Sequence, residues 1–288
     1  MIRTLPRGAI ERYGIAGYVG AFFVFLFLPL AVVALYAFND ANYPAPPWRG
    51  FTLDWFLGDG ARGRIGLFAD RALLASVGTS LIVAVWVTLL SVAVGTVNAF
   101  LLERADFRGK AALSLAMLAP LVIPGVILGI SILAFASRLA GVADDYLGLE
   151  LEFLRPGLPL VVAGQFSYIV SIATLTIAAR LERFDATLEE AALNLGASRA
   201  AVLRTITLPY LRPAMIGAAA IAFLMSFENF NTTLMLVGSD APLTIMMYGR
   251  MREGASPVLN AVSLFMMVAS ALLALTLQPA RDVAARKP

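Results

Sequence analysis

Hydrophobic positions along the chain gather into six long stretches separated by shorter polar segments. Each stretch reaches about 20 residues, the length that an α-helix needs to cross the hydrocarbon core of a bilayer. Lipid offers no partner for an unpaired backbone N–H or C=O group, so each stretch is expected to be helical. The expected spans cover about residues 15–38, 73–102, 111–136, 158–179, 214–237 and 258–277.

The first stretch follows a basic N-terminal segment, a pattern that is also typical of a secretion signal. Arg3, Arg7 and Arg12 lie in this segment. The apolar stretch is longer than the roughly 7–15 residues of a signal core, and no small-x-small cleavage site follows it. The sequence therefore predicts a first span that is retained.

Composition agrees with this pattern. The 288 residues are 60% hydrophobic and 14% charged, whereas soluble domains are about 45–50% apolar and about 25% charged. Histidine and cysteine are absent, which excludes disulfide frameworks, thiolate metal sites and histidine-based catalysis. We expect an all-α polytopic membrane protein, a single transmembrane domain over residues 1–288, with no catalytic residue and no metal site.

The distribution of basic residues predicts the orientation of the chain. With both termini in the cytoplasm, 14 of the 22 Lys and Arg residues fall in inner segments and 8 in outer loops, as the excess of positive charge on cytoplasmic loops requires. The formal net charge of +3 therefore reflects topology and does not indicate a nucleic-acid partner. Two of the three outer loops have a distinct composition: a Pro- and Trp-rich loop over 39–71, expected to be irregular and to lie at the membrane surface, and an acidic loop over 138–157.

The inner segment over residues 180–212 has its own organisation. Its first half carries an apolar stripe at helical spacing, formed by Leu181, Phe184, Leu188, Ala192 and Leu195. Gly196 suits a left-handed residue that ends this helix. Ser198 is expected to cap a second helix over 199–207, which Pro209 and Pro213 then stop before the fifth span.

One motif in this segment is specific. Glu190-Ala191-Ala192 is followed after three residues by Gly196, and after nine more by Ile206-Thr207-Leu208-Pro209. This pattern resembles the EAA loop of ABC importer permeases at every defining position. The stretch from Leu73 to Glu103 and the run from Ser226 to Gly238 are similar to the spermidine/putrescine permease group, and to its PotC-type subunits in particular.

The resemblance implies a fold, a location and partners. The fold is the MetI-like fold of type I ABC importer permeases in the bacterial inner membrane. The implied partners are a second permease subunit, a dimer of ATP-binding-cassette ATPases and a periplasmic solute-binding protein. The chain has no Walker A loop, since Gly109-Lys110 lacks the required first glycine and the following Ser or Thr. This chain is therefore not expected to be an enzyme or to bind a cofactor; ATP and magnesium would be used by the partner ATPase.

In such permeases the EAA helix lies in a groove of the ATPase. Helix-in-groove binding needs apolar anchors at i, i+3, i+4 and i+7, which Leu188, Ala191, Ala192 and Leu195 provide. Small residues allow a close approach, and Glu190 is placed to pair with a basic or amide group of the groove. The expected coupling residues are Leu188, Glu190, Ala191, Ala192, Leu195, Gly196, Ile206, Leu208 and Pro209.

Polar residues inside the spans indicate a candidate path. Glu228 is the one acidic residue within the six stretches, and Asn231 and Thr232 follow at i+3 and i+4, so we expect the three to share a helix face. With Phe227 beside it, Glu228 suits a translocating ammonium group. Pairing of Glu228 with the second permease is the alternative. Tyr168, on a polar strip of the fourth span with Gln165 and Ser171, is a further candidate for the path.

The third span combines prolines with small residues. Pro120 and Pro124 are expected to bend the helix. Gly125 and Gly129 form a small-xxx-small pair that favours close helix packing over a role in the path.

The preferred function is that of a permease subunit that forms half of the path for a small cationic or zwitterionic solute, by resemblance a polyamine such as putrescine or spermidine. An ABC importer permease for another solute (an amino-acid derivative, an opine, iron or thiamine) is one alternative. A self-contained secondary transporter is another, although its inverted repeats and intramembrane charges are not found in the sequence. An integral-membrane enzyme lacks the residues for acid–base or metal chemistry.

Overall fold

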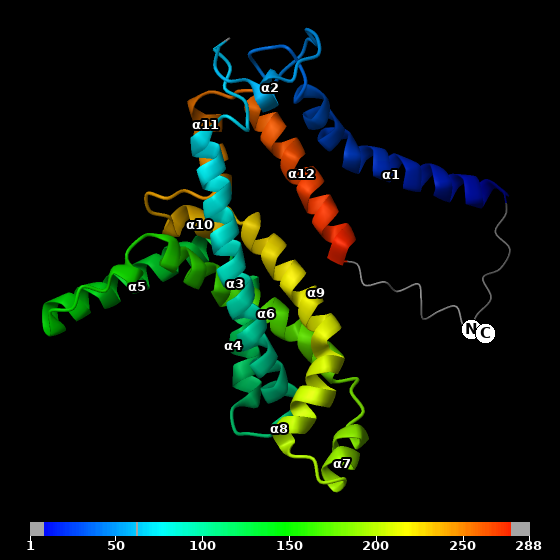
Figure 1. Cartoon of the computed structure of the whole chain (residues 1–288), viewed down its shortest axis with the longest axis vertical. Coiled ribbons are helices and arrows are strands. Elements are labelled where there is room, and N and C mark those ends of the chain that lie inside the picture. The colour runs from blue at the N-terminus through cyan, green and yellow to red at the C-terminus, as the bar shows by residue number, and fades with distance from the viewer. Residues whose placement is uncertain (1–8, 62, 278–288) are drawn as a thin grey trace. The chain divides into compact units, whose positions relative to one another are not determined.

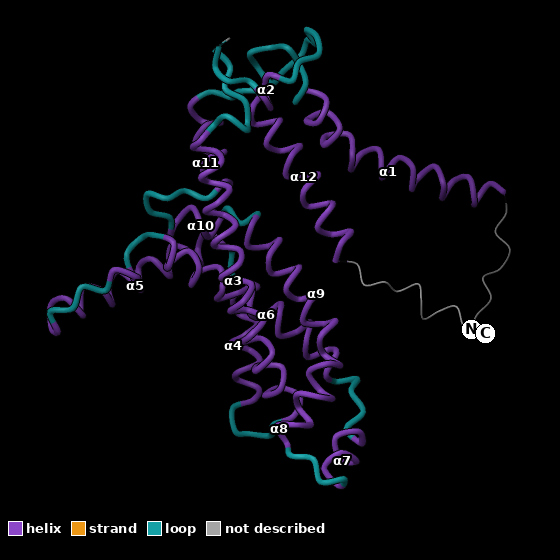
Figure 2. Tube along the Cα trace, in the orientation of Figure 1, coloured by secondary structure: helices purple, strands orange, loops and turns teal. Residues whose placement is uncertain are grey.

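A computed structural model describes residues 9–61 and 63–277 of the protein, and they form helices joined by loops without a β-strand (Figures 1 and 2). The apolar helices in the first half are α1 (Ala9–Tyr36), α3 (Arg71–Arg104), α4 (Lys110–Val122), α5 (Gly125–Leu147) and α6 (Leu158–Leu181), with the short α2 (Asp54–Leu57) and the 3-10 turn η1 (Glu152–Leu154) between them. The second half contains α7 (Thr187–Asn194), α8 (Arg199–Val202), the π-helical turn η2 (Leu203–Thr207), α9 (Leu208–Phe227), α10 (Asn231–Leu236), α11 (Leu243–Glu253) and α12 (Val258–Leu277).

Five helices of the described chain are long and apolar enough to cross a membrane. They lie at 13–36, 71–104, 125–147, 158–181 and 199–227, which matches the expected first, second and fourth spans and parts of the third and fifth. The helix α12 begins where the sixth span is expected. The part of it whose side chains are described, Val258–Leu272, is apolar but shorter than a full span. The count of six spans therefore stays a prediction. So does the orientation, which depends partly on Arg3, Arg7, Arg62, Arg281, Arg286 and Lys287, all outside the described residues.

The helices form two compact units, and the expected single domain stays a prediction. Unit 1 comprises Met1–Arg71 and Gly249–Ala269, and unit 2 comprises Ala72–Tyr248 and Ser270–Pro288. In unit 1, the helix α1 carries large apolar side chains that are exposed along its length, such as Phe25 at 80% exposure. Such a surface is unfavourable in water and suits contact with lipid or another membrane helix.

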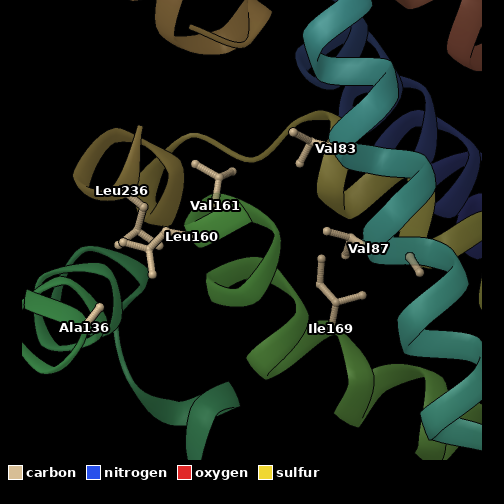
Figure 3. Close-up of a cluster of buried hydrophobic side chains, with 8 residues drawn as sticks. Val83, Val87, Ala136, Leu160, Val161, Ile169 and Leu236 are labelled. Atoms are coloured by element: carbon tan, nitrogen blue, oxygen red, sulfur yellow. The ribbon is translucent and has the colours of Figure 1, made fainter. Parts of the chain in front are cut away.

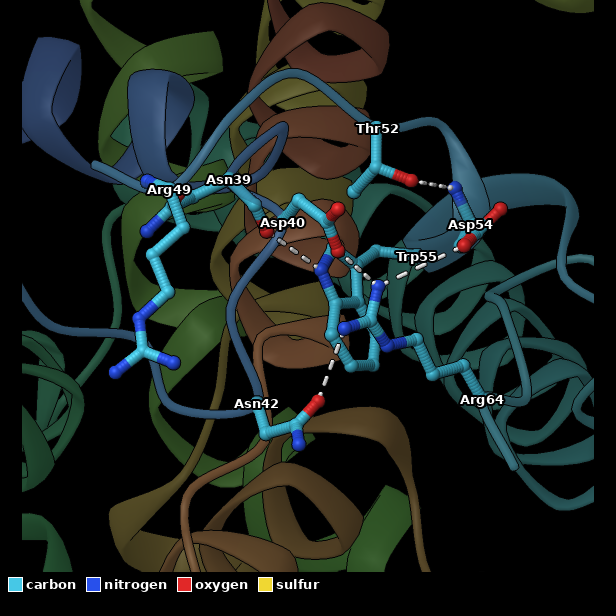
Figure 4. Close-up of polar contacts among 8 residues, drawn as sticks. All are labelled: Asn39, Asp40, Asn42, Arg49, Thr52, Asp54, Trp55 and Arg64. Atoms are coloured by element: carbon cyan, nitrogen blue, oxygen red, sulfur yellow. Dashed lines mark hydrogen bonds and ion pairs between the residues drawn. The ribbon is translucent and has the colours of Figure 1, made fainter. Parts of the chain in front are cut away.

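The loop that follows α1 in unit 1 is irregular, as expected, but polar contacts order it (Figure 4). The Asn39 carboxamide oxygen accepts a hydrogen bond from the Arg49 backbone N–H at 2.8 Å, and the Asn39 carbonyl accepts one from the Trp55 indole at 2.9 Å. The Arg64 guanidinium lies 5.0 Å from the Trp55 ring centroid and pairs with Asp40. Burial of Trp55 beneath these contacts gives the loop a small core of its own.

Unit 2 is centred on α6, which packs along α9 and against α10. One apolar cluster joins α3, α5, α6, α9 and α10; Figure 3 shows seven of its labelled members, namely Val83, Val87, Ala136, Leu160, Val161, Ile169 and Leu236. A second cluster joins α3, α6 and α9 around Ala173, Ile177 and Leu211. The deep burial of α6 between these clusters makes it the central helix of the unit.

The expected close packing at Gly125 and Gly129 is confirmed, and the partner is α10. A Cβ atom at Gly129 would lie 2.9 Å from Met235 Cβ and 3.0 Å from the Thr232 carbonyl oxygen. On α6, a Cβ atom at Gly164 would overlap with Leu236 Cδ1. Glycines on α5 and α6 thus let the short helix α10 fit between the two longer helices.

The expected third span is not one bent helix but two separate helices. Ile123, which ends α4, has an extended backbone with ψ 129°, and α5 begins after Pro124. A proline disfavours the helical conformation of the residue before it, so Pro124 breaks the span, whereas Pro120 is accommodated inside α4. The helix α5 then continues to Leu147, so Arg138, Asp144 and Asp145 lie on a helix and not in the expected acidic loop.

Candidate functional site

Two sites correspond to the two sets of residues that the sequence singled out: the segment over residues 180–212, called the EAA segment below, and a polar cavity beside α6. Both lie within unit 2.

The EAA segment does not contain the single helix predicted from Leu181 to Leu195. The helix α6 ends at Leu181, the chain turns, and α7 begins at Thr187. The Asp185 carboxylate accepts hydrogen bonds from the Thr187 N–H at 3.0 Å and the Thr187 hydroxyl at 2.7 Å. These local bonds compete with helical ones and place the turn there. They also hold the pKa of Asp185 below its ordinary value of 3.8.

This turn divides the predicted apolar stripe between two environments. Leu181 and Phe184 are buried against α9, where the Phe184 ring lies 4.9 Å from that of Tyr210. Leu188 and Leu195 instead stand out from the molecule at 52% and 89% exposure. No residue of α7 is fully buried, and Leu188 faces outward without a partner in the described chain.

The ends of α7 and α8 form as predicted. Gly196 adopts a left-handed conformation with φ 86° and ends the first helix, and the Ser198 hydroxyl caps the second by accepting from the Ala201 N–H at 3.2 Å. The predicted stop at Pro209 and Pro213 is wrong. Helical structure runs on from Arg199 to Phe227, with Pro209 directly after the π-helical turn η2 and Pro213 accommodated inside α9.

The coupling residues expected from the motif fall into two groups, one exposed and one half-buried. Glu190, Ala191, Gly196 and Pro209 are exposed with Leu188 and Leu195, while Ala192, Ile206 and Leu208 are half-buried. Ile206 packs on the apolar cluster of α6 and α9. The outward face of α7 is therefore available for contact, and Ile206 serves the internal packing.

The sequence did not single out Glu189, which faces inward. Its carboxylate accepts a hydrogen bond of 2.5 Å from the Thr207 hydroxyl and lies 3.5 Å from the Arg104 guanidinium at the end of α3. A cavity of about 550 Å3 adjoins these groups, lined also by Phe100, Leu193, Arg199, Val202 and Leu203. Glu189 thus connects α7 to α3 and to the π-helical turn η2, which leads directly into α9.

The second site is a cavity of about 270 Å3 between α4, α5, α6 and the α9–α10 turn. Of the residues predicted for a solute path, Tyr168, Asn231 and Thr232 line it together, and Asn229, which the prediction omitted, joins them. Apolar side chains complete the wall: Pro120, Leu121, Ile123, Leu128 and Met225. Neutral polar groups on an apolar wall are typical of a small-molecule site.

A hydrogen-bond network stands behind this wall. Asn229 donates to the Tyr168 hydroxyl at 2.6 Å, and its carboxamide oxygen accepts from the Thr233 hydroxyl at 2.7 Å. Gln165, only 1% exposed, donates to the Thr233 hydroxyl at 2.8 Å and accepts from Ser226. The polar strip predicted on α6 is therefore split, since Tyr168 reaches the cavity while Gln165 supports it. Ser171 instead donates to the carbonyl of Met117 on α4.

The expected face shared by Glu228, Asn231 and Thr232 is wrong. The helix α9 ends at Phe227, and α10 begins at Asn231. The Asn229 side chain bonds to the Thr233 N–H at 3.1 Å and so starts a new helix in place of the old one. A polar run with an Asn four residues before a Thr was the signal for this break.

Glu228 occupies the C-terminal cap of α9 and is exposed. Its carboxylate forms no hydrogen bond or ion pair with any residue that the structure describes. Phe227 stacks on Phe223 at 6.0 Å between ring centroids, and Phe230 contacts Tyr248 at 5.0 Å, so these rings pair with other rings. A carboxylate at a helix C-terminus is electrostatically unfavourable, and no described residue of unit 2 pairs with it.

Comparison with known proteins identifies similar chains. A sequence profile described as "Binding-protein-dependent transport system inner membrane component" matches residues 91–286. The putrescine transport system permease protein PotI of Escherichia coli (strain K12) is 29% identical over 247 residues, covering 84% of this chain and 81% of that protein. The spermidine/putrescine transport system permease protein PotC of the same organism is 26% identical over 279 residues, covering 96% and 94%.

A solved structure is also similar. A chain of the bacterial alginate ABC transporter, in complex with an alginate pentasaccharide-bound periplasmic protein, superposes with a TM-score of 0.71. The match covers 93% of this chain and 92% of that chain at 17% sequence identity. At this level of identity the likeness concerns the fold.

Proposed function

The chain belongs to the binding-protein-dependent transport system inner membrane components, and from this premise we propose that it forms half of the path by which a polyamine enters the cell. It is a permease subunit of an ABC importer. The type I permease fold and the similarity to the spermidine/putrescine permease group, both expected from the sequence, are confirmed. In the proposed mechanism, ATP and magnesium are used by a separate ATPase dimer, and work reaches the path through the EAA segment.

The outward face of α7 carries the coupling part of the proposal. Leu188, Ala191 and Leu195 follow one another at i, i+3 and i+7 and are all exposed. An amphipathic helix that enters a groove needs this spacing. Exposed leucines without a partner are costly in water, and burying each contributes about 1.5–3 kcal/mol. This unpartnered face is the observation that supports docking on an ATPase.

The chemistry of the path supports a polyamine as the solute. Glu228 supplies an uncompensated carboxylate, and the adjacent cavity supplies the Tyr168 hydroxyl and the Asn231 amide. Ammonium groups are held in proteins by carboxylates and by neutral oxygen acceptors. The relatives PotI and PotC are named as putrescine and spermidine/putrescine permeases, which favours this solute class.

One permease of this kind provides one side of a path, so a second permease is proposed to provide the other. A periplasmic solute-binding protein is proposed to deliver the solute, because the alginate transporter was solved in complex with a periplasmic protein that holds its alginate. Both termini are proposed to lie in the cytoplasm, which also places the EAA segment on the side where ATP is available.

The test is purification of the tagged chain from membranes that also contain the neighbouring ATPase, permease and binding protein of its genome. We expect the ATPase to co-purify and to support ATP-dependent uptake of radiolabelled putrescine in proteoliposomes. Glu190→Lys or Gly196→Val should abolish both, because the first reverses a charge on α7 and the second strains a left-handed residue.

Glu182→Gln is the matched control, since Glu182 is an exposed carboxylate at the other end of the segment. It should leave association and uptake unchanged. Retention of the ATPase and of uptake by both Glu190→Lys and Gly196→Val would contradict the coupling role. Uptake by the purified chain alone would favour a secondary transporter.

A further inference from the structure

The inner side of α7 carries a polar contact that the motif does not include. Glu189 and Glu190 are adjacent in the sequence but lie on different faces of α7. Glu190 is exposed and forms no hydrogen bond or ion pair with a residue in the described part of the chain. Glu189 is half-buried and bonds to Thr207 and to Arg104, residues that lie 18 positions after it and at the end of α3.

Thr207 occupies a special position because the π-helical turn η2 ends on it. In a regular α-helix, residues five apart point about 140° away from each other. Val202 and Thr207 are five apart, yet both are buried, at 5% and 0% exposure. The wider turn of η2 brings the two side chains to one face. As a result, the Thr207 hydroxyl meets Glu189.

Apolar burial contributes little to holding α7 in place, since Ala192 is only half-buried. None of its residues is buried, and beside it lies the cavity of about 550 Å3 that Arg104 and Thr207 line. A helix next to an open cavity and without a buried side chain is free to tilt unless a specific contact prevents it. The bonds of Glu189 supply that contact, and a hydrogen bond to a charged group contributes more than a neutral one.

From these observations we infer that Glu189, Thr207 and Arg104 form a clasp that makes α7 move as one body with α9 and α3. Glu189 is a positioning residue: it touches neither the ATPase face nor the solute cavity, and it passes displacement of α7 to the helix that leads to Glu228 and Asn229. This inference depends on the proposed docking of α7 on an ATPase. Without the clasp, α7 would follow the ATPase while α9 stayed behind.

The absence of cysteine from the chain allows a direct test in the assembled complex. Asn194→Cys on α7 and Ile216→Cys on α9 give two exposed sites for spin labels. A complex with the unsubstituted permease is the control, because any label that it takes up is attached to cysteines of the partner subunits. With the clasp intact, we expect the distance between the labels to stay the same in the nucleotide-free and the ATP-bound complex. In Thr207→Val, which removes the hydroxyl, the distance should change or its distribution should broaden when ATP binds.

Transport provides the second readout. Thr207→Val and Glu189→Gln should raise the ATP hydrolysed per putrescine imported by about tenfold, the effect of losing a charge-assisted hydrogen bond. Thr207→Ser, which keeps the hydroxyl, should restore the normal ratio and the narrow distance distribution. Association with the ATPase should remain normal in all three variants, because the outward face of α7 is unchanged.

The outcomes separate the clasp from the docking surface. Normal ATPase association together with an unchanged label distance in Thr207→Val overturns the clasp alone. Loss of the ATPase in Glu189→Gln to the extent seen in Glu190→Lys also overturns it, because Glu189 would then belong to the docking surface. Absence of an ATPase from the unsubstituted complex overturns the proposed function and, with it, this inference.

Discussion

Tyr168 and Asn229 lie 61 positions apart and are joined by a hydrogen bond of 2.6 Å from the Asn229 amide nitrogen to the phenol oxygen. The bond connects α6, the central helix of unit 2, to the turn where α9 ends. Since the oxygen of the same amide is held by Thr233, the amide cannot rotate without losing both partners. The polar wall of the cavity is therefore fixed in orientation before a solute arrives, which reduces the cost of ordering it on binding.

This geometry predicts the effect of Tyr168→Phe. The substitution removes the phenol oxygen, leaves the Asn229 amide without its acceptor and takes one oxygen acceptor from the cavity wall. We expect the KM for putrescine uptake to rise about threefold to tenfold, as for the loss of one hydrogen bond. Tyr146→Phe on α5 removes an exposed hydroxyl and is the control. An equal KM in the two variants would contradict a role of Tyr168 in the path.

Gln165→Leu tests the network behind the wall. Leucine fills a similar volume but leaves the buried hydroxyls of Ser226 and Thr233 without their shared partner. Loss of a buried partner costs about 1–3 kcal/mol in soluble proteins, and hydrogen bonds inside membrane proteins average about 0.6 kcal/mol. We expect a loss of about 1–2 kcal/mol in thermal unfolding of the purified complex. Ser167→Ala, whose hydroxyl bonds only within α6, should be nearly neutral.

Gly129→Ala tests the close approach of α5 and α10. The added methyl group would lie within 3.0 Å of the Thr232 backbone oxygen and of Met235 Cβ, so the two helices must separate. Overpacking of this kind costs about 1–3 kcal/mol, and we expect lower thermal stability and lower yield. Gly141→Ala, on the same helix with nothing within 4 Å of the new atom, should have no such effect. Equal stability of the two variants would show that the packing is looser than described.

Sequence patterns alone were sufficient for the positions of most apolar helices and of the EAA segment. Hydropathy depends on many residues, so single breaks hardly change it. Because hydropathy is averaged in this way, it does not show the breaks at Pro124 and Glu228. One proline causes the first break, and one interaction between Asn229 and Thr233 causes the second, each within a stretch of about 20 mostly apolar residues. The left-handed Gly196 and the Ser198 cap were predictable because each depends on residues next to it.

Only some residues of the candidate sites could be predicted from the sequence. Tyr168, Asn231 and Thr232 were expected in a path for separate reasons, and they line one cavity. The contacts of Glu189 and Asn229 were not foreseen. The hydrogen bond of Glu189 depends on Thr207, 18 residues away in a π-helical turn, and that of Asn229 depends on Tyr168, 61 residues away. Such pairings arise from tertiary packing, and helical periodicity contains no information about them.

Acid should loosen the start of α7. The pKa of Asp185 lies below 3.8 because the Thr187 hydroxyl and N–H bond to its carboxylate. At a pH above 3.8, the pKa of this carboxyl group in the unfolded chain, its ionised form stabilises the folded turn. This stabilisation is lost as the pH falls through the lower pKa of the folded state. We expect hydrogen exchange at the start of α7, corrected for intrinsic rates, to accelerate below about pH 4. Thr187→Val should make that change smaller, because the folded pKa of Asp185 then lies closer to the unfolded value, and an unchanged profile would show that Thr187 does not set the pKa of Asp185.

Glu228→Gln decides between the two roles of the carboxylate. The substitution removes a negative charge from the C-terminal end of α9, where it opposes the helix dipole, so the stability of the chain should not fall and can rise by about 0.3–1 kcal/mol. If Glu228 holds an ammonium group, the KM for putrescine uptake rises at least about tenfold, since a charge-assisted bond is lost, while assembly with the second permease stays normal. If Glu228 instead pairs with the second permease, assembly falls first and the complexes that remain keep their KM. Asp240→Asn, an exposed carboxylate shortly after α10, controls for the change in overall charge. An unchanged KM with normal assembly would remove Glu228 from the solute path and leave Tyr168, Asn229 and Asn231 as a neutral site, which fits an uncharged solute better than a polyamine.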